Sequence, residues 1–344
     1  MTEVFAWSTG QDENIGDSLL RRPLLDHLRS IGPLRVFVGA ATPGFKTGLG
    51  VQHDDHLFTS FPTWLFQAAR TAVSGTRVTL VANAGEVPVS RKGALRVAAI
   101  RAVGLLPRVT LLWLGAGVPG ARSILSKPYA SLAKAARGAA FRDAESITLL
   151  GAGATMPDWA FSLGTPTREW QDASARTRLA LVLRGDRTRP SDAWVEWVRG
   201  LADGLHLTPT LVVQVRRDTA LARDLAAELA GEVVEFPESR SHAAQEELVR
   251  RIYREARLVV GDRLHGLIVG ATEGAVPLGW VESSRGKIAR HFSTVGLVWV
   301  GAGEGQRVQT YSPLGAADIA RYSSELTASV ESARLAIADA AALA

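Results

Sequence analysis

The stretch that decides the fold is residues 258–271, which read Leu-Val-Val-Gly-Asp-Arg-Leu-His-Gly-Leu-Ile-Val-Gly-Ala. Its apolar beginning predicts a short buried strand, and Gly261-Asp262 predicts a turn. Apolar residues then recur at helical spacing, at Leu264, Leu267, Ile268 and Ala271. We expect Asp262 to be the N-cap of this helix. A buried strand followed by a turn and a helix is typical of α/β proteins with a parallel sheet.

The first turn of this predicted helix contains Arg263 and His265. Free backbone N–H groups and the helix dipole favour anions at such a position. A histidine that exchanges a proton near neutral pH, with Lys287 nearby in sequence, suits an acidic substrate that must be protonated. The same pattern is common in α/β proteins, in which His265 would be only a surface or capping residue. The local sequence leaves both interpretations open.

Short apolar runs alternate with helical segments along the whole chain. Strands are expected at 4–7, 34–38, 78–82, 109–114, 139–141, 179–183, 210–215, 232–235, 258–260 and 278–281. Buried strands separated by helices predict parallel sheets covered on both faces. Because 344 residues exceed the usual size of one core, we expect two Rossmann-like domains, at 1–165 and 176–312, joined by a polar linker. Residues 313–344 predict an amphipathic helix able to pack back across the domains.

Composition limits the class of protein. Hydrophobic residues make up 47% and charged residues 21% of the chain, as in globular proteins. The absence of cysteine excludes disulfides and thiolate zinc sites. No signal peptide is apparent, and the apolar run at 109–118 is shorter than the roughly 20 residues of a membrane-spanning helix. We expect a cytoplasmic location and leave peripheral membrane association open.

The charge pattern argues against a nucleic-acid partner. The formal charge is only +5, no block of five like charges occurs, and aromatic residues do not interleave with basic ones. A metal site is not expected either, since the loop His53-Asp54-Asp55-His56 offers only adjacent side chains, which seldom converge on one ion. Only 5 of the 39 basic residues are lysines, which makes Lys287 a notable choice at its position.

Four short elements, in order, resemble the polysaccharide pyruvyltransferase family. They are Asn14-Ile15-Gly16-Asp17, Arg142-Asp143 with Ser146, residues 157–161 (Pro-Asp-Trp-Ala-Phe), and Arg263-Leu264-His265-Gly266 followed by Pro277 and Gly286-Lys287. Each element is short, but the ordered set spans most of the chain. The chain differs from the family where Asn83-Ala84-Gly85 stands in place of a Gly-Gly-Gly turn, and where the tyrosine before the lysine is absent.

The resemblance implies a GT-B-like α/β architecture, in which two doubly wound domains face a cleft. It also implies transfer of the pyruvyl group of phosphoenolpyruvate to hydroxyls of a sugar or lipid-linked glycan of a cell-envelope or extracellular polysaccharide, with release of phosphate and without a cofactor. His265 and Asp17 would be the catalytic residues, with His265 donating the proton. Asn14 and Asp17 would also orient the acceptor or close the cleft. Arg142, Arg263 and Lys287 would hold the anionic donor.

Several questions stay open at this stage. Arg184 follows a predicted strand, and it either reaches the donor or is a solvated loop residue. A nucleotide-sugar glycosyltransferase of GT-B type and a non-catalytic polysaccharide-binding or assembly protein are the alternative functions. Asn14, Arg142, Arg184 and His265 all follow predicted strand ends, where α/β sheets bind ligands. The acceptor sugar, the ketal positions and the oligomeric state are not predicted.

Overall fold

The computed structural model describes residues 2–280, 286–301 and 315–342. The chain divides into two compact units. The first unit comprises residues 1–12, 17–159 and 335–344, and the second comprises 13–16 and 160–334. The division thus falls between Trp159 and Ala160, before the polar segment expected as a linker, and the short segment 13–16 groups with the second unit.

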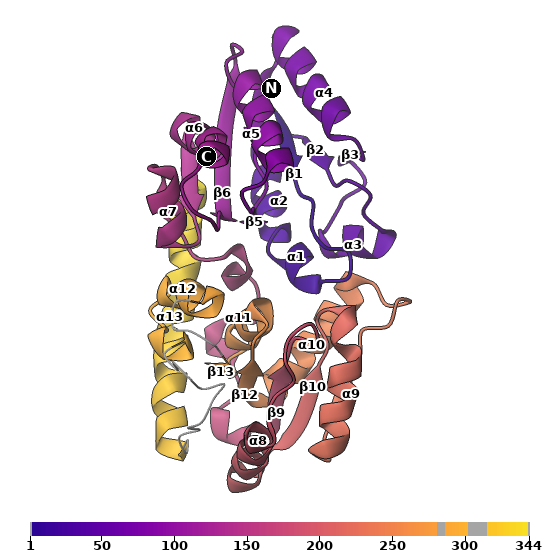
Figure 1. Cartoon of the computed structure of the whole chain (residues 1–344), viewed down its shortest axis with the longest axis vertical. Helices are drawn as coiled ribbons and strands as arrows, with labels where there is room; N and C mark the ends of the chain where they lie inside the picture. The colour runs from indigo at the N-terminus through magenta and orange to yellow at the C-terminus, as the bar shows by residue number, and fades with distance from the viewer. Residues whose placement is uncertain (1, 281–285, 302–314, 343–344) are drawn as a thin grey trace. The chain divides into compact units, whose positions relative to one another are not determined.

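The first unit contains one parallel sheet (Figure 1). Its main strand order is β3-β2-β1-β4-β6-β7-β8, and β5 pairs with β6. The strands are β1 (Thr2–Trp7), β2 (Leu34–Phe37), β3 (His56–Phe58), β4 (Arg77–Val81), β5 (Gly85–Glu86), β6 (Val109–Gly117), β7 (Gly138–Phe141) and β8 (Ala154–Thr155). The helices are α1 (Ile15–Leu19), α2 (Arg22–Arg29), α3 (Pro43–Gly48), α4 (Phe61–Val73), α5 (Arg91–Val103), α6 (Lys127–Ala135) and α7 (Ala144–Leu150).

The core of the first unit is aromatic. Trp7, Phe37, Phe61 and Trp64 are buried and in mutual ring contact, with the Trp7 and Phe61 centroids 5.4 Å apart. The strands are apolar on both faces because helices cover both sides of a doubly wound sheet. Helix α6 ends at Ala135, and the chain enters β7 at Gly138.

The second unit contains a five-stranded parallel sheet in the order β11-β10-β9-β12-β13. Its strands are β9 (Arg178–Val182), β10 (Thr208–Val212), β11 (Glu232–Val234), β12 (Ala256–Gly261) and β13 (Val276–Gly279). Its helices are α8 (Asp192–Leu205), α9 (Thr219–Glu228), α10 (His242–Glu255), α11 (Leu264–Thr272) and α12 (Lys287–Ser293). In both sheets the strand order reverses beside the first strand, between β1 and β4 and between β9 and β12. Doubly wound sheets bind ligands outside the carboxyl ends of the strands at such a point.

The last helix, α13 (Ala316–Ala342), buries one stripe of side chains. Ile319, Leu326, Val330 and Ile337 lie on this stripe, and Tyr322 stacks on Trp299 with 4.2 Å between centroids. The helix is shared between the units, with 316–334 assigned to the second and 335–342 to the first. None of the helices in the described ranges is long and apolar enough to cross a membrane.

Candidate functional site

The strongest candidate site lies at the carboxyl ends of β9 and β12, in the second unit. Arg184 follows β9, and Arg263 and His265 follow β12. Their position at the reversal of strand order is where a doubly wound sheet binds its ligand. The sequence therefore located these three residues correctly relative to the sheet.

Helix α11 is held tightly against the sheet by two glycines. A Cβ atom on Gly266 would approach the Val182 side chain to 2.6 Å, and one on Gly270 would approach Val259 to 2.5 Å. Every residue of α11 is buried, His265 included. This close packing fixes the amino end of α11 at the ends of β9 and β12.

The amino end of α11 lacks a side-chain cap. The N-cap residue is Arg263, which makes no capping hydrogen bond, so the expectation that Asp262 caps the helix is wrong. The Asp262 carboxylate instead accepts a hydrogen bond of 2.8 Å from the Arg184 backbone N–H. Leu264 is a buried residue, and no hydrogen bond from its N–H is found among the described residues. By contrast, α4, α5, α8 and α10 are each capped by a serine.

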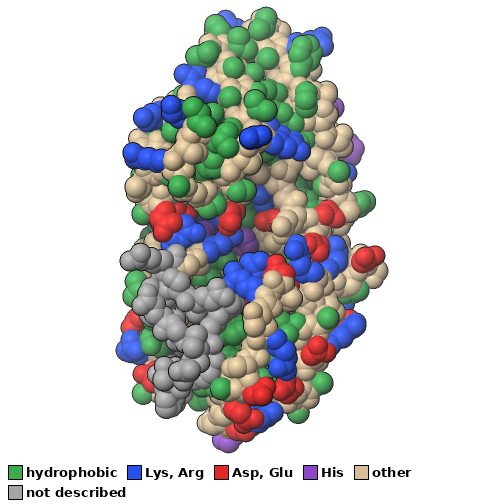
Figure 2. Space-filling view, viewed as in Figure 1, with side chains coloured by type: hydrophobic (Ala, Val, Ile, Leu, Met, Phe, Trp, Pro, Cys, Tyr) green, Lys and Arg blue, Asp and Glu red, His purple; other side chains and the backbone are tan. Residues whose placement is uncertain are grey.

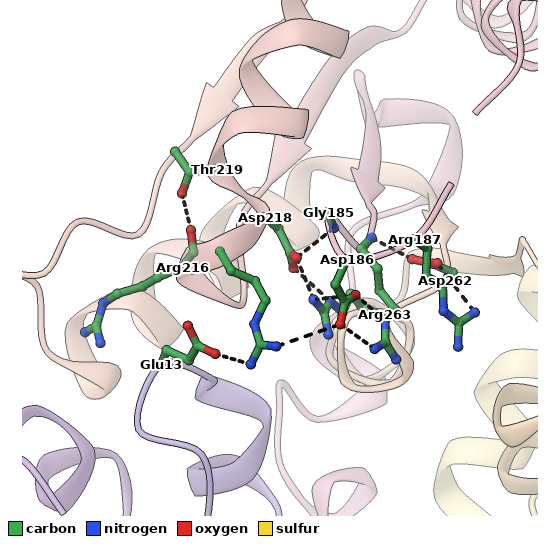
Figure 3. A network of polar contacts seen from close by, with 11 residues as sticks. Glu13, Gly185, Asp186, Arg187, Arg216, Asp218, Thr219, Asp262 and Arg263 are labelled. Atoms are coloured by element: carbon green, nitrogen blue, oxygen red, sulfur yellow. Dashed lines mark hydrogen bonds and ion pairs between the residues drawn. The ribbon is translucent and has the colours of Figure 1, made fainter. Parts of the chain in front are cut away.

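Arginines and carboxylates form a continuous network beside this helix end (Figure 3). Asp218 accepts two hydrogen bonds from the Arg263 guanidinium, at 2.5 and 2.8 Å, and a third of 2.8 Å from the Gly185 N–H. Arg184 binds Asp186 through two contacts of 2.8 Å. Such bidentate pairs fix both partners in one geometry.

The network is electrically balanced. Arg187 lies 3.8 Å from Asp262, and Arg217 binds Glu13 and lies 3.8 Å from Asp186. The hydrogen bonds from Arg184 hold the pKa of the Asp186 carboxyl well below its usual range. Four arginines thus face four carboxylates, and Arg263 is neutralised by Asp218. This pairing argues against Arg263 as a clamp for a strongly anionic donor.

His265 contacts the short segment 13–16. A Cβ atom on Gly16 would lie 2.8 Å from His265 Cγ and closer still to Nδ1, so only glycine fits here. The segment is held by Ile15 N–H to Gln214 O at 3.2 Å and by Arg216 N–H to Glu13 O at 3.1 Å. The Asn14 side chain accepts from the Gly16 N–H at 3.0 Å and so shapes this turn.

The structure places Lys287 at the first position of α12. Its side chain is partly buried, and its carbonyl oxygen accepts a hydrogen bond of 2.8 Å from Nδ1 of His291. Residues 281–285, where the family tyrosine is absent, lie outside the described residues.

The remaining predicted site residues belong to the first unit. Arg142 follows β7, is buried, and binds the buried Asp158 at 2.7 Å. Asp143 caps α7 by accepting from Ser146, whose hydroxyl in turn accepts from the Val118 N–H at 2.7 Å. The Arg-Asp-x-x-Ser element therefore has a structural role that the sequence comparison did not reveal.

Asp17 is paired with Arg21, a buried residue that the sequence analysis did not identify. Asp17 accepts from the Gln11 N–H at 2.6 Å and lies 3.4 Å from Arg21, which is buried and donates to Asn83 Oδ1 and Ala84 O. Burial lowers the pKa of the Arg21 guanidinium. The available signal was the i,i+4 spacing of Asp17 and Arg21 beside an apolar run. Arg21 thus orders the Asn83-Ala84-Gly85 turn after β4.

Comparison with known proteins gives a match only at the level of structure. No protein-family model and no curated protein matches this sequence. UDP-GlcNAc 2-epimerase from Neisseria meningitidis, bound to UDP-GlcNAc, has a TM-score of 0.57 at 9% identity, over 99% of this chain and 98% of its own. The S. aureus MnaA-UDP co-structure has a TM-score of 0.55 at 10% identity, over 96% and 91%. A Thermobaculum terrenum O-GlcNAc transferase has a TM-score of 0.50 at 11% identity, over 99% and 65%.

These similarities correct the function expected from the sequence. Pyruvyl transfer from phosphoenolpyruvate is wrong as a prediction, because the structural neighbours include UDP-GlcNAc 2-epimerases and an O-GlcNAc transferase. The pairing of Arg263 with Asp218 and of Arg142 with Asp158 agrees with this correction. The predicted fold is confirmed: the chain has the GT-B-type α/β architecture, with two doubly wound Rossmann-like units.

Proposed function

We propose that this protein is a glycosyltransferase that uses a nucleotide-diphosphate sugar, and that the diphosphate binds at the amino end of α11. The observation that carries the proposal is the uncapped amino end of α11 at the reversal of strand order. There the N–H of the buried residue Leu264 has no hydrogen-bond partner among the described residues. Buried backbone N–H groups nearly always have a partner. A phosphate oxygen satisfies this donor and interacts favourably with the helix dipole.

The charge balance of the neighbouring network suits a nucleotide-sugar donor. Because its arginines already face carboxylates, the network supplies oriented N–H donors with little net positive charge. A diphosphate esterified at both ends carries less charge per phosphate than a free phosphate monoester, and it needs such donors more than it needs bare cations. UDP and UDP-GlcNAc are bound in two of the structural neighbours, so uridine nucleotides are the first ligands to test.

The proposed reaction is displacement at the anomeric carbon of the donor sugar. An acceptor hydroxyl forms a bond to that carbon, the bond from the carbon to the diphosphate oxygen breaks, and the nucleoside diphosphate leaves. The α11 N–H groups stabilise the negative charge that develops on the leaving oxygen. His265, in the first turn of the same helix, accepts the proton of the acceptor hydroxyl.

The test compares two substitutions at one position. Proline is tolerated at the first position of a helix but has no N–H, and Arg263 before it already has the extended backbone that proline requires, at φ −94° and ψ 108°. Leu264→Pro therefore removes the donor, whereas Leu264→Ala truncates the side chain and keeps it.

We expect calorimetry with UDP to show about 10-fold to 100-fold weaker binding for Leu264→Pro than for Leu264→Ala, from the loss of a hydrogen bond to a charged group worth about 1.5–3 kcal/mol. Equal affinities of the two variants, or no binding of UDP or UDP-sugars by the wild-type protein, would contradict the proposal.

A second candidate reaction is 2-epimerisation of the nucleotide sugar. The observation that favours it is the match in length with the Neisseria meningitidis epimerase, which the O-GlcNAc transferase lacks. Product analysis separates the two: epimerisation converts the free nucleotide sugar without an acceptor, whereas transfer releases nucleoside diphosphate only when a glycan acceptor is present.

A further inference from the structure

One segment of the first unit has a large excess of basic over acidic residues, although the chain as a whole does not. Residues 61–137 contain eleven lysines and arginines but one acidic residue, Glu86. Their formal charge is therefore +10, and since the whole chain carries +5, the other residues together carry −5. This excess coexists with the absence of any block of five like charges, because the basic residues are spread over the whole segment.

The segment builds three neighbouring helices, α4, α5 and α6. Seven of the eleven cations lie on these helices: Arg70 on α4, Arg91, Lys92, Arg96 and Arg101 on α5, and Lys127 and Lys134 on α6. On α4, Phe66, Arg70 and Val73 are exposed, at positions i, i+4 and i+7. On α6, Lys127 and Lys134 are exposed at i and i+7. The three helices thus form one basic face of the first unit.

The basic residues of this face are not neutralised within the protein. None of the eleven makes an ion pair with an acidic side chain in the part of the chain that the structure describes. Figure 2 shows the same region, where α5 and α6 lie, with blue and green side chains and no red ones among them. The positive charge of the basic face is therefore available to a partner, apart from that of Arg96, whose guanidinium packs over core aromatic rings.

The basic face also exposes large apolar side chains. Phe66 is 67% exposed, Leu95 on α5 74%, Leu105 just after α5 71%, and Ile124 just before α6 74%. Isolated exposed apolar residues are ordinary, but a group of them among unpaired cations typifies a surface that meets a membrane interface. Basic side chains attract anionic headgroups while the apolar ones enter the boundary with the acyl chains.

A shallow cavity between α5 and α6 adds a place for a headgroup. It has a volume of about 480 Å³ and is lined by Arg101, Lys127, Ala130, Ser131, Lys134 and Ala135. Three cations and a serine hydroxyl suit a phosphate, and the cavity opens on the basic face.

We propose that the basic face of α4, α5 and α6 binds the surface of an anionic phospholipid bilayer, with a lipid phosphate in the cavity between α5 and α6. Nucleic acid is the competing polyanion, but the exposed large apolar residues of this face include no tryptophan or tyrosine for base stacking. The outside of a duplex is mainly phosphate and sugar, which gives Leu95, Leu105 and Ile124 no apolar surface to contact. The inference is independent of the proposed reaction in the second unit.

The test is sedimentation of the full chain with phosphatidylglycerol vesicles and with phosphatidylcholine vesicles, at low and high salt. We expect binding to the first lipid that weakens with salt, and little binding to the second. The double variant Lys127→Glu/Lys134→Glu loses two basic residues, each of which should raise the affinity for an anionic membrane about 5-fold. Its affinity for phosphatidylglycerol vesicles should therefore fall by at least about 25-fold.

The matched control is Arg251→Glu/Arg254→Glu, on an exposed part of α10 in the second unit, which changes the net charge equally. It should keep most of the wild-type affinity. Leu95→Ser, at an exposed position that preserves folding, should lower affinity about tenfold. The proposal would be overturned if the two double variants lost vesicle affinity equally, or if the wild-type protein did not bind the vesicles. It would also be overturned if the protein bound a DNA or RNA duplex more tightly than vesicles at the same salt concentration.

Discussion

Replacing Gly16 by alanine tests the contact between the 13–16 segment and His265. The added Cβ would lie 2.8 Å from His265 Cγ and 2.9 Å from its Cβ, whereas ordinary contacts begin near 3.4 Å. Neither side can move easily. The segment is pinned by two backbone hydrogen bonds to Gln214 and Arg216, and α11 rests on Val182 through Gly266.

An added methyl group in a tightly packed place typically costs about 1–3 kcal/mol. For a unit of this size, about 2–4 °C of melting temperature corresponds to each kcal/mol. We therefore expect Gly16→Ala to lower the melting temperature of the second unit by about 2–12 °C, measured by differential scanning calorimetry.

Gly200→Ala is the matched control. Gly200 lies inside α8, and a Cβ atom there would meet no atom within 4 Å. The same chemical change should raise stability there, by about 0.5–1 kcal/mol, because alanine is a better helix former than glycine. If Gly16→Ala melts at or above the wild-type temperature, or if both variants shift equally, the close contact with His265 is not present in the protein.

Two further predictions concern the first unit. Arg142→Met should lower the free energy of unfolding by about 3–5 kcal/mol, because it leaves the buried Asp158 carboxylate uncompensated, whereas Arg142→Met/Asp158→Leu should recover most of that loss. Urea unfolding of the wild type, the two single variants and the double variant measures the coupling, and additive effects would show that the pair is not coupled. Burial lowers the pKa of His27 in the folded protein, so as the pH falls this side chain is protonated in the unfolded chain before it is protonated in the folded one. The free energy of unfolding should therefore fall as the pH drops below about 6.5. His27→Gln should flatten that pH dependence, whereas His53→Gln on an exposed loop should leave it unchanged.

The sequence predicted the sheets well because the signal for a buried parallel strand is local. Runs such as 179–183 and 258–260 are apolar on both faces, and the structure has strands there, β9 and β12. The strand-turn-helix around Arg263 was also predicted, and with it the position of His265 at a strand end. Only the N-cap of α11 was misassigned. The Asp262 carboxylate accepts a hydrogen bond from the Arg184 N–H, which lies 78 residues away in the chain, and no local pattern indicates this partner.

The sequence by itself thus determined the α/β class, the two-unit organisation into parallel sheets and the residues at the strand ends, since these follow from hydrophobic period and turn residues. The tertiary structure alone decided what those residues do. It pairs Arg263 with Asp218 and Arg142 with Asp158, and it places Gly16 against His265. It also brings seven of the eleven cations of residues 61–137 onto three neighbouring helices. The physical reason is that the hydrophobic period is a local property of the sequence, whereas a charge interacts with whatever lies near it in space. A guanidinium either binds an external anion or forms a neutral pair with a carboxylate, and its neighbours in the folded protein decide which.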